Sequence, residues 1–248
     1  RDQNPLHGAG YVAQDGQRRW QWDWFARRDL MKRMAATFLK VRNGKPPIFV
    51  AHSSATWSIP FISFCDANMT FEHSNSGYFS NPSFLSKYGA NHEQISADLK
   101  NGAKNFLRWV FPKERWQAEL TGRQFGLPTV IMSNLTKSPQ VDKEFANSVK
   151  AARELGAFVI AHDAILWPIW CNTAPLIEIV KIREQFGTAE ADVKFFPYWD
   201  TENPVKSNST DISVSVYQRP GKFLLNICNL SEKPVAGSVD LSALKPVQ

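Results

Sequence analysis

Four short apolar runs, each followed by polar residues, constrain the fold of this chain more than any other feature. They cover residues 48–51, 69–72, 127–132 and 157–161. A continuous apolar run of this length is typical of a strand that is buried on both faces, as in a parallel sheet. Patterns of helical period separate the runs. The repeat of strand, polar loop and helix therefore predicts an α/β protein.

The expected helices cover residues 20–41, 93–110, 112–126, 141–155 and 173–186. Asn43 and Gly44 would end the first of them, Gly156 the fourth and Gly187 the last, because glycine and asparagine tolerate the left-handed backbone of a helix C-terminus. Residues 1–19 show no period and are rich in turn residues, so we expect a loop there.

Each apolar run ends on its C-terminal side in groups that can ionise or form hydrogen bonds, namely His52, Glu72 with His73, Asn134, and His162 with Asp163. In a (β/α)₈ barrel this edge of the sheet carries the active site. We therefore expect residues 1–190 to form the C-terminal portion of a (β/α)₈ TIM-type barrel. An open doubly wound sheet is the alternative, although no glycine-rich phosphate loop follows any of the runs.

The period changes near residue 191. Antiparallel strands are expected over residues 193–199, 212–217, 223–229 and 238–241. Ile212, Val214 and Val216 alternate with Ser213 and Ser215, which is typical of a sheet with one face in water. We therefore expect residues 191–248 to form a partial β-sandwich domain, with fewer than the ~7 strands that such a domain usually contains.

Charge and cysteine content argue against several classes of partner. The net charge is +6. The basic cluster at residues 27–42 lies on a helical pattern, which indicates a helix face exposed to solvent. We therefore expect no nucleic acid as a partner. Cys65, Cys171 and Cys228 are too far apart to predict a disulfide framework or a zinc knuckle. No apolar run is long enough to span a membrane.

Export from the cytoplasm is indicated by four patterns for N-glycosylation, which begin at Asn68, Asn134, Asn208 and Asn229. Such acceptor patterns act only in secreted proteins. We therefore expect an extracellular or periplasmic protein, and a glycoprotein if the patterns are used.

Several segments together carry a family resemblance: Asn4-Pro-Leu-His-Gly-Ala-Gly-Tyr11, Arg28-Asp-Leu-Met-Lys-Arg33, Ala51-His-Ser53, Thr121-Gly-Arg-Gln-Phe-Gly-Leu-Pro128, Phe196-Pro-Tyr-Trp199 and Ser215-Val-Tyr-Gln-Arg-Pro-Gly-Lys-Phe-Leu-Leu225. They resemble glycoside-hydrolase-like proteins related to the family-123 glycosidases, in which a (β/α)₈ barrel precedes a β-sandwich. The resemblance implies an oligosaccharide or polysaccharide as partner. It also implies a fragment, incomplete at both ends, whose barrel is completed by remaining segments of the same polypeptide or by another chain, because a half-barrel would expose two sheet edges.

Glycoside hydrolysis needs two carboxyl groups, one protonated to release the leaving oxygen and one ionised to attack or to activate water. Glu72 is the expected general acid, because the end of an apolar strand disfavours a charged carboxylate. A salt bridge at the strand end is the alternative role for Glu72. Asp163 is the expected second catalytic residue, with Asp66 or a residue on an upstream strand as alternatives.

The expected substrate-binding residues are His52, His73, His162, Trp57, Trp167 and Trp170. Imidazoles can donate hydrogen bonds to sugar hydroxyls, and indoles can stack on the apolar face of a pyranose. For each histidine alone, a structural role is the alternative. A metal held by His52, Glu72 and His162 is conceivable, but nothing in their spacing requires one, so no metal and no cofactor is expected.

These residues predict a carbohydrate-active protein, a glycoside hydrolase that uses a carboxyl general acid. The alternative is a non-catalytic carbohydrate-binding or surface-structural protein that retains the barrel scaffold, since a fold does not fix a function. A Ser–His–Asp hydrolase is a third possibility. It has weaker support, because Ser53 and Ser54 follow a strand without the Gly-x-Ser-x-Gly elbow.

Overall fold

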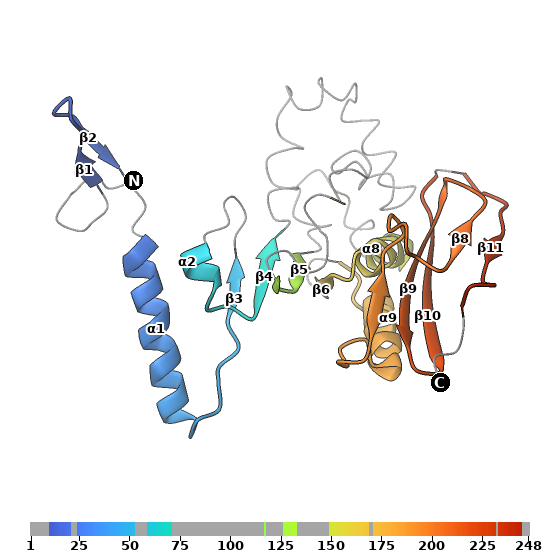
Figure 1. The fold of residues 1–248 in the computed structure, drawn as a ribbon, viewed down its shortest axis with the longest axis horizontal. Coiled ribbons are helices and arrows are strands. Elements are labelled where there is room, and N and C mark those ends of the chain that lie inside the picture. The colour runs from blue at the N-terminus through green and yellow to red at the C-terminus, as the bar shows by residue number, and fades with distance from the viewer. Residues whose placement is uncertain are drawn as a thin grey trace. The chain divides into compact units, whose positions relative to one another are not determined.

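The computed structural model describes residues 10–20, 24–52, 59–70, 117, 126–132, 149–168, 171–231 and 233–244 (Figure 1). The chain divides into two compact units, residues 1–68 and 69–248, which are described separately below. The expected domain boundary after residue 190 stays a prediction. The expected helices over 93–110 and 112–126 fall almost entirely outside the described residues.

A short hairpin lies in the first unit, where the sequence predicts a loop. Strands β1 (Gly10–Val12) and β2 (Arg18–Trp20) pair in antiparallel fashion. Asp15 stabilises the connecting turn by accepting hydrogen bonds from Gln17 N at 3.0 Å and from the Arg19 guanidinium at 2.6 Å. Strands of three residues are too short to show a period, which is why the sequence pattern misses them.

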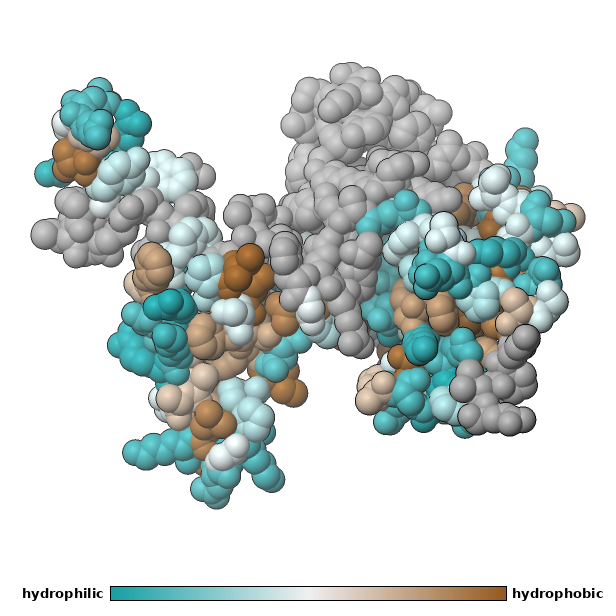
Figure 2. Space-filling model, viewed as in Figure 1, coloured by the Kyte–Doolittle hydropathy of each residue, from teal (hydrophilic) through white to brown (hydrophobic). Residues whose placement is uncertain are grey.

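Helix α1 (Trp24–Val41) confirms the first expected helix except at its start, because Trp20 belongs to β2. Asn43 and Gly44 have φ angles of 51° and 83°, so both adopt the left-handed conformation predicted for the end of the helix. The visible face of α1 carries hydrophilic and hydrophobic residues side by side (Figure 2).

The first unit continues with β3 (Val50–His52), α2 (Ile59–Ile62) and β4 (Ala67–Thr70). Strand β4 straddles the division between the units, and β3 and β4 are hydrogen-bonded neighbours. Just before β4, the Asp66 carboxylate accepts a hydrogen bond from Phe49 N at 2.7 Å. Asp66, an alternative second carboxylate, therefore supports the backbone at this point.

In the second unit, the prediction of a strand at residues 157–161 is wrong. These residues complete helix α8 (Val149–Ala161), and the strand that follows is β6 (Ile165–Trp167). Strand β6 runs parallel to β5 (Thr129–Met132). The buried residues of α8 include Ala152, Leu155 and Val159, which lie at helical spacing. A short apolar run cannot by itself distinguish a buried strand from a buried helix segment.

Gly156 lies inside α8 rather than at its end, which corrects its expected role as a C-cap. A Cβ atom at this position would lie 2.4 Å from Ile179 Cδ1 and 3.2 Å from Leu176 Cδ2, both on helix α9 (Ala174–Phe186). The absence of a side chain therefore permits the close approach of α8 and α9. By contrast, Gly187 has a φ angle of 82° and does cap α9, as predicted.

Replacing Gly156 by leucine is expected to lower the free energy of unfolding by about 2 kcal/mol, because the added side chain overpacks the contact between α8 and α9. Leucine favours helix more than glycine does, so any loss reflects packing. Urea denaturation measures the change. Shortening the facing side chain with Ile179→Ala should restore part of the loss, and a double variant without any recovery would contradict this account.

Two antiparallel sheets follow. In the first, the strand order is β10-β9-β7, formed by β7 (Lys194–Phe196), β9 (Ile212–Arg219) and β10 (Lys222–Asn229). The second pairs β11 (Val239–Asp240) with β8 (Lys206–Ser207). The four expected strands are confirmed within a few residues, whereas the two-residue β8 was not predicted.

The expected wet face of β9 is buried, which corrects the sequence-based interpretation. Ser213 and Ser215 are 5% and 0% exposed. Val214 and Val216 pack on the opposite face of β9 in a cluster with Val205. Helix α8 contacts β9 and β10, and Figure 1 shows α8 and α9 beside this sheet. Both faces of the strand are therefore covered, and the Ser215 hydroxyl binds the end of helix α8 instead of water.

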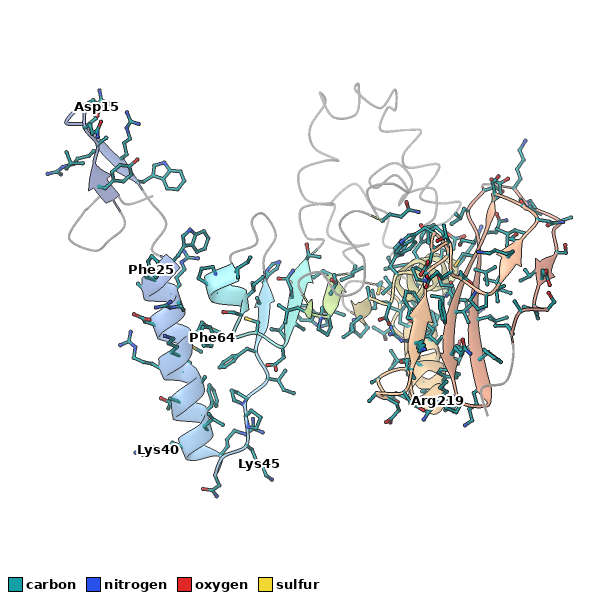
Figure 3. All side chains as sticks on the ribbon, in the orientation of Figure 1. Asp15, Phe25, Lys40, Lys45, Phe64 and Arg219 are labelled. Carbon is teal, nitrogen blue, oxygen red and sulfur yellow. The ribbon has the colours of Figure 1, made fainter. Side chains whose placement is uncertain are left out.

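Arg219 ties the end of β9 to α9. Its guanidinium donates a hydrogen bond to Phe186 O at 3.0 Å and pairs with Asp192 at 3.2 Å. Figure 3 labels this residue. The helical layer and the antiparallel sheet are thus held together by polar contacts as well as by apolar packing.

Candidate functional site

The structure describes His52, His162, Asp163 and Trp167 among the predicted site residues. The others, Glu72, His73, Trp57 and Trp170, lie outside the described residues, and their roles stay predictions. His52 is exposed on β3. Trp167 on β6 is 39% exposed. His162 and Asp163 follow α8 directly and are the best-defined part of the predicted site.

The backbone that carries Asp163 closes the C-terminus of α8. Asp163 has a φ angle of 54°, in the left-handed region that usually holds glycine or asparagine. Ala164 N donates to Val159 O at 3.1 Å, and Asp163 N donates to Ile160 O at 3.0 Å. These two bonds are the pattern of a Schellman cap. The turn therefore projects the Asp163 side chain from the end of the helix.

Strand β9 supplies further donors to the end of α8. The last carbonyl groups of a helix have no partner within it and need donors from elsewhere. The Ser215 hydroxyl donates to Ala161 O at 2.8 Å. The Tyr217 hydroxyl lies 3.2 Å from Ile160 O and 3.0 Å from Asp163 Oδ1, and its one proton is donated to either acceptor in turn. The antiparallel sheet thus completes the helix end that presents Asp163.

His162 is 1% exposed and engaged through both ring nitrogens. Its Nδ1–H donates to Phe158 O at 2.7 Å, so Nε2 is the acceptor, and the Tyr198 hydroxyl lies 3.4 Å from it. The Trp199 ring lies 5.2 Å away, centroid to centroid. Burial lowers the pKa of His162 to about 4. This environment favours the structural alternative for His162, while its contact with substrate stays a prediction.

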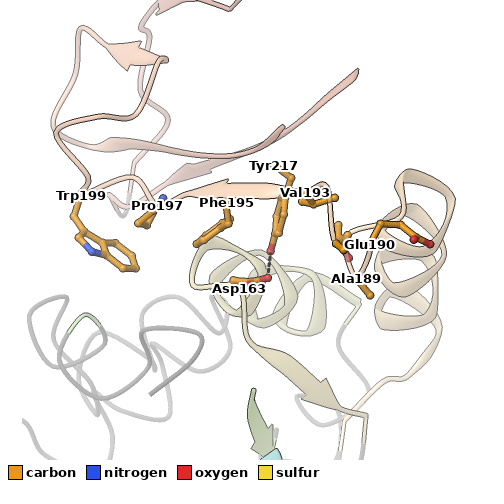
Figure 4. A pocket seen from close by; sticks show the side chains of 10 residues that line it. Asp163, Ala189, Glu190, Val193, Phe195, Pro197, Trp199 and Tyr217 are labelled. Atoms are coloured by element: carbon orange, nitrogen blue, oxygen red, sulfur yellow. Dashed lines mark hydrogen bonds between the residues drawn. The ribbon is translucent and has the colours of Figure 1, made fainter. Parts of the chain in front are cut away.

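Asp163 Oδ1 is held by two donors. Arg183 forms an ion pair with it at 3.1 Å, and the Tyr217 hydroxyl lies at 3.0 Å, as the dashed line in Figure 4 marks. Arg183 also donates to Ala164 O at 2.6 Å, and its guanidinium carbon lies 5.6 Å from the centre of the Tyr217 ring. A cation and a hydroxyl donor stabilise the ionised form of a carboxyl group. This geometry therefore suits Asp163 as a carboxylate rather than as an acid.

Replacing Arg183 by methionine is expected to lower the free energy of unfolding by about 2 kcal/mol. The variant leaves a largely buried carboxylate and the Ala164 carbonyl without their donor. Both charged side chains retain some exposure, 17% for Arg183 and 16% for Asp163, which moderates the loss. Urea denaturation measures it.

Arg183→Lys is the matched comparison, because lysine keeps the charge but cannot reach both acceptors with one planar group. It should recover part of the stability lost in the methionine variant. Equal stability of wild type and the methionine variant would show that the ion pair contributes nothing.

A pocket of about 490 Å³ opens beside Asp163 (Figure 4). Its walls come from the end of α8, the turn after α9, β7 with its flanks, and β9. The lining residues are Asp163, Thr188, Ala189, Glu190, Ala191, Val193, Phe195, Pro197, Trp199 and Tyr217. This volume lies within the ~300–1,000 Å³ range of small-molecule sites.

One wall of the pocket is apolar and was not predicted. Val193, Phe195, Pro197 and Trp199 alternate along the chain, and Figure 4 shows them in a row facing the pocket. A period of two places Val193, Phe195 and Pro197 on the same side of β7 and its flanks, and Trp199 lies in the turn that follows. The signal was present in the sequence, but it was interpreted only as evidence for a strand of the second domain.

The described ranges offer no group of three or more His, Cys, Asp or Glu side chains that could hold a metal ion. In the same ranges, no helix is both long and apolar enough to cross a bilayer. Among the predicted glycosylation sites, Asn68 is 0% exposed within β4. Asn208 and Asn229 are exposed.

Comparison with known proteins gives one result. Residues 176–245 match the family described as "Glycoside hydrolase 123, C-terminal domain". No curated protein and no solved structure matched the chain. The matched residues begin within α9, include β7, β9 and β10, and contain every residue that lines the pocket except Asp163. The C-terminal part of this chain is therefore related to glycoside hydrolase family 123.

Proposed function

We propose that this protein is a glycoside hydrolase that acts on an oligosaccharide or polysaccharide. The observation that carries the proposal is the position of Asp163, whose carboxyl group pairs with Arg183 at the edge of a pocket with an apolar, aromatic wall. The family relationship of residues 176–245 supports the same class of substrate. A sugar presents both hydroxyl groups and an apolar face, which suits a pocket with one polar and one aromatic side.

In this proposal Glu72 is the general acid and Asp163 the ionised partner. Arg183 and Tyr217 favour the charged form of Asp163, as the second carboxyl group of a glycosidase requires. The proposed scaffold is a (β/α)₈ barrel that is followed by a β-sandwich. The described parallel pair β5–β6 and the antiparallel sheets are consistent with both.

We also propose an extracellular or periplasmic location. The exposed positions of Asn208 and Asn229 support it, because a glycan there would project into solvent. The buried amide of Asn68 does not suit modification of the folded chain. Expression in a secretory host, followed by enzymatic removal of N-glycans, should reduce the apparent mass of the wild type more than that of an Asn208→Gln/Asn229→Gln variant, which keeps the pattern at Asn134.

The test of the enzymatic proposal is the release of sugar by the full chain. Aryl glycosides and a panel of polysaccharides are incubated with the protein, and new reducing ends are measured. The wild type should release sugar from at least one member of the panel. Binding to a polysaccharide without any release would contradict hydrolysis.

A second candidate function is carbohydrate binding without catalysis. The contacts of Asp163 favour it, because the same Oδ1 atom is held by Arg183 and by the Tyr217 hydroxyl. A carboxylate with such partners can serve to lock a helix end as well as to attack a sugar. An Asp163→Asn variant separates the two, because only the catalytic role predicts a loss of turnover with unchanged affinity for the polysaccharide.

A further inference from the structure

We propose that the pocket beside Asp163 is a binding site for an uncharged oligosaccharide of at least two rings, with Trp199 stacking on one ring and Glu190 accepting hydrogen bonds from another. This inference rests on the proposed function for its class of ligand, but it concerns recognition rather than bond cleavage. Trp199 and Glu190 were not among the site residues expected from the sequence.

The apolar wall provides the stacking surface. Val193, Phe195 and Pro197 face the pocket from β7 and its flanks, and Trp199 faces it from the turn that follows. The C–H face of a pyranose is flat and apolar, and an indole ring offers a matching surface of low flexibility. Stacking on Trp199 would leave the equatorial hydroxyl groups of the sugar directed toward the polar side of the pocket.

Trp199 is held in place before a ligand arrives. Its ring lies 4.7 Å from the Tyr198 ring at an interplanar angle of 88°, and 5.2 Å from the His162 ring at 31°. His162 is itself fixed by its bond to Phe158 O. A side chain that is already ordered loses little conformational entropy on binding. The indole is therefore prepared as a platform.

The polar groups of the pocket lie away from the indole. In Figure 4, Trp199 and Glu190 are at opposite ends of the pocket, and Asp163 lies between them. A single ring stacked on Trp199 would therefore not extend to Glu190, whereas two linked rings would follow the length of the pocket. Glu190 is exposed in the turn after α9, where its carboxylate can accept hydrogen bonds from sugar hydroxyls.

The charges of the pocket select against acidic sugars. Asp163 and Glu190 are both acidic, and two nearby cations, Arg183 and Arg219, are paired with Asp163 and Asp192. A uronic acid would place a third negative charge beside these two groups, and like charges repel more strongly where water is partly excluded. The geometry thus points to a neutral saccharide.

The experiment measures the binding of cellobiose, lactose and maltose to the full chain by saturation-transfer NMR and titration calorimetry. Trp199→Ala should weaken binding about tenfold, and Trp199→Phe, which keeps an aromatic face, by no more than about threefold. Glu190→Gln should weaken binding about threefold. A disaccharide that contains glucuronic acid should bind less tightly than its neutral counterpart to the wild type.

The matched controls are Trp20→Ala and Glu202→Gln, two exposed residues of the same types that do not line the pocket. Both should bind as the wild type does. The inference is overturned if none of the three neutral disaccharides binds, if Trp199→Ala and Glu190→Gln retain full affinity, or if the acidic sugar binds as tightly as the neutral one. Glu190→Gln and Trp199→Phe keep the test valid if the alanine variant does not fold.

The two proposals can fail separately. If binding depends on Trp199 but no sugar is released, the proposed hydrolysis is overturned and the proposed binding site is supported. If sugar is released but substitution of Trp199 and Glu190 leaves the affinity unchanged, the proposed hydrolysis is supported and the proposed binding site is overturned. Repeating the titrations in Glu72→Gln prevents turnover of the ligand from disturbing the measurement.

Discussion

Between about pH 6.5 and pH 4, the folded protein is expected to lose about 3 kcal/mol of stability through His162 alone. Burial lowers the pKa of this side chain to about 4, whereas an unfolded chain has a histidine pKa of about 6.5. In this window the unfolded state binds the proton and the folded state does not, so stability falls as the pH falls. The difference of about 2.5 pKa units corresponds to about 3 kcal/mol, at about 1.4 kcal/mol per unit.

Urea denaturation at several pH values measures this dependence. His162→Asn is the informative variant, because its amide can still donate to Phe158 O but has no proton to gain. It should be less stable than the wild type at pH 7 and should show a smaller loss on acidification. His52→Asn, which changes an exposed histidine, serves as the control. A wild-type slope in His162→Asn would contradict the assignment.

Glu72→Gln is expected to lower the rate of sugar release by about 10³-fold. Glutamine has a similar shape but no proton to give to the leaving oxygen, and general acid catalysis contributes about 10²–10⁴-fold. The loss should be greatest for substrates with a poor leaving group, because an activated aryl glycoside needs less help from an acid. Turnover of alkyl and aryl glycosides by wild type and variant measures this contrast.

Glu202→Gln is the control for the loss of one carboxylate, since Glu202 is exposed and does not line the pocket. It should keep the activity of the wild type. Equal reductions for both classes of substrate in Glu72→Gln would mean that Glu72 affects the fold or the binding of sugar instead of proton transfer. Full activity of the Glu72→Gln variant would show that Glu72 is not the general acid.

The sequence correctly predicted the helix ends at which the residue type itself favours the backbone conformation that ends a helix. Gly187 ends α9 and Asn43 with Gly44 ends α1, because each adopts the left-handed conformation that its residue type favours. The strand periods of β9 and β10 likewise identified an antiparallel sheet. In these cases local chemistry alone determines the structure.

The errors have a different origin, because they depend on contacts that are distant in the sequence. Gly156 was predicted to end a helix, but it lies inside α8, where the side chain of Ile179 leaves no room for a Cβ atom. Ser215 looked exposed, but its hydroxyl binds Ala161 O, 54 residues away. The pocket beside Trp199 was missed for the same reason, since its residues meet only when β7, β9 and the end of α8 pack together.

The contact between α8 and β9 bears on the evolution of this protein. Ser215 and Tyr217 bind carbonyl groups at the end of α8. A sheet exchanged for an unrelated one would leave the buried Ala161 carbonyl without its donor, at a cost of about 1–3 kcal/mol, whereas Ile160 O would keep its bond from Asp163 N. The helix and the sheet are therefore expected to be inherited as one unit.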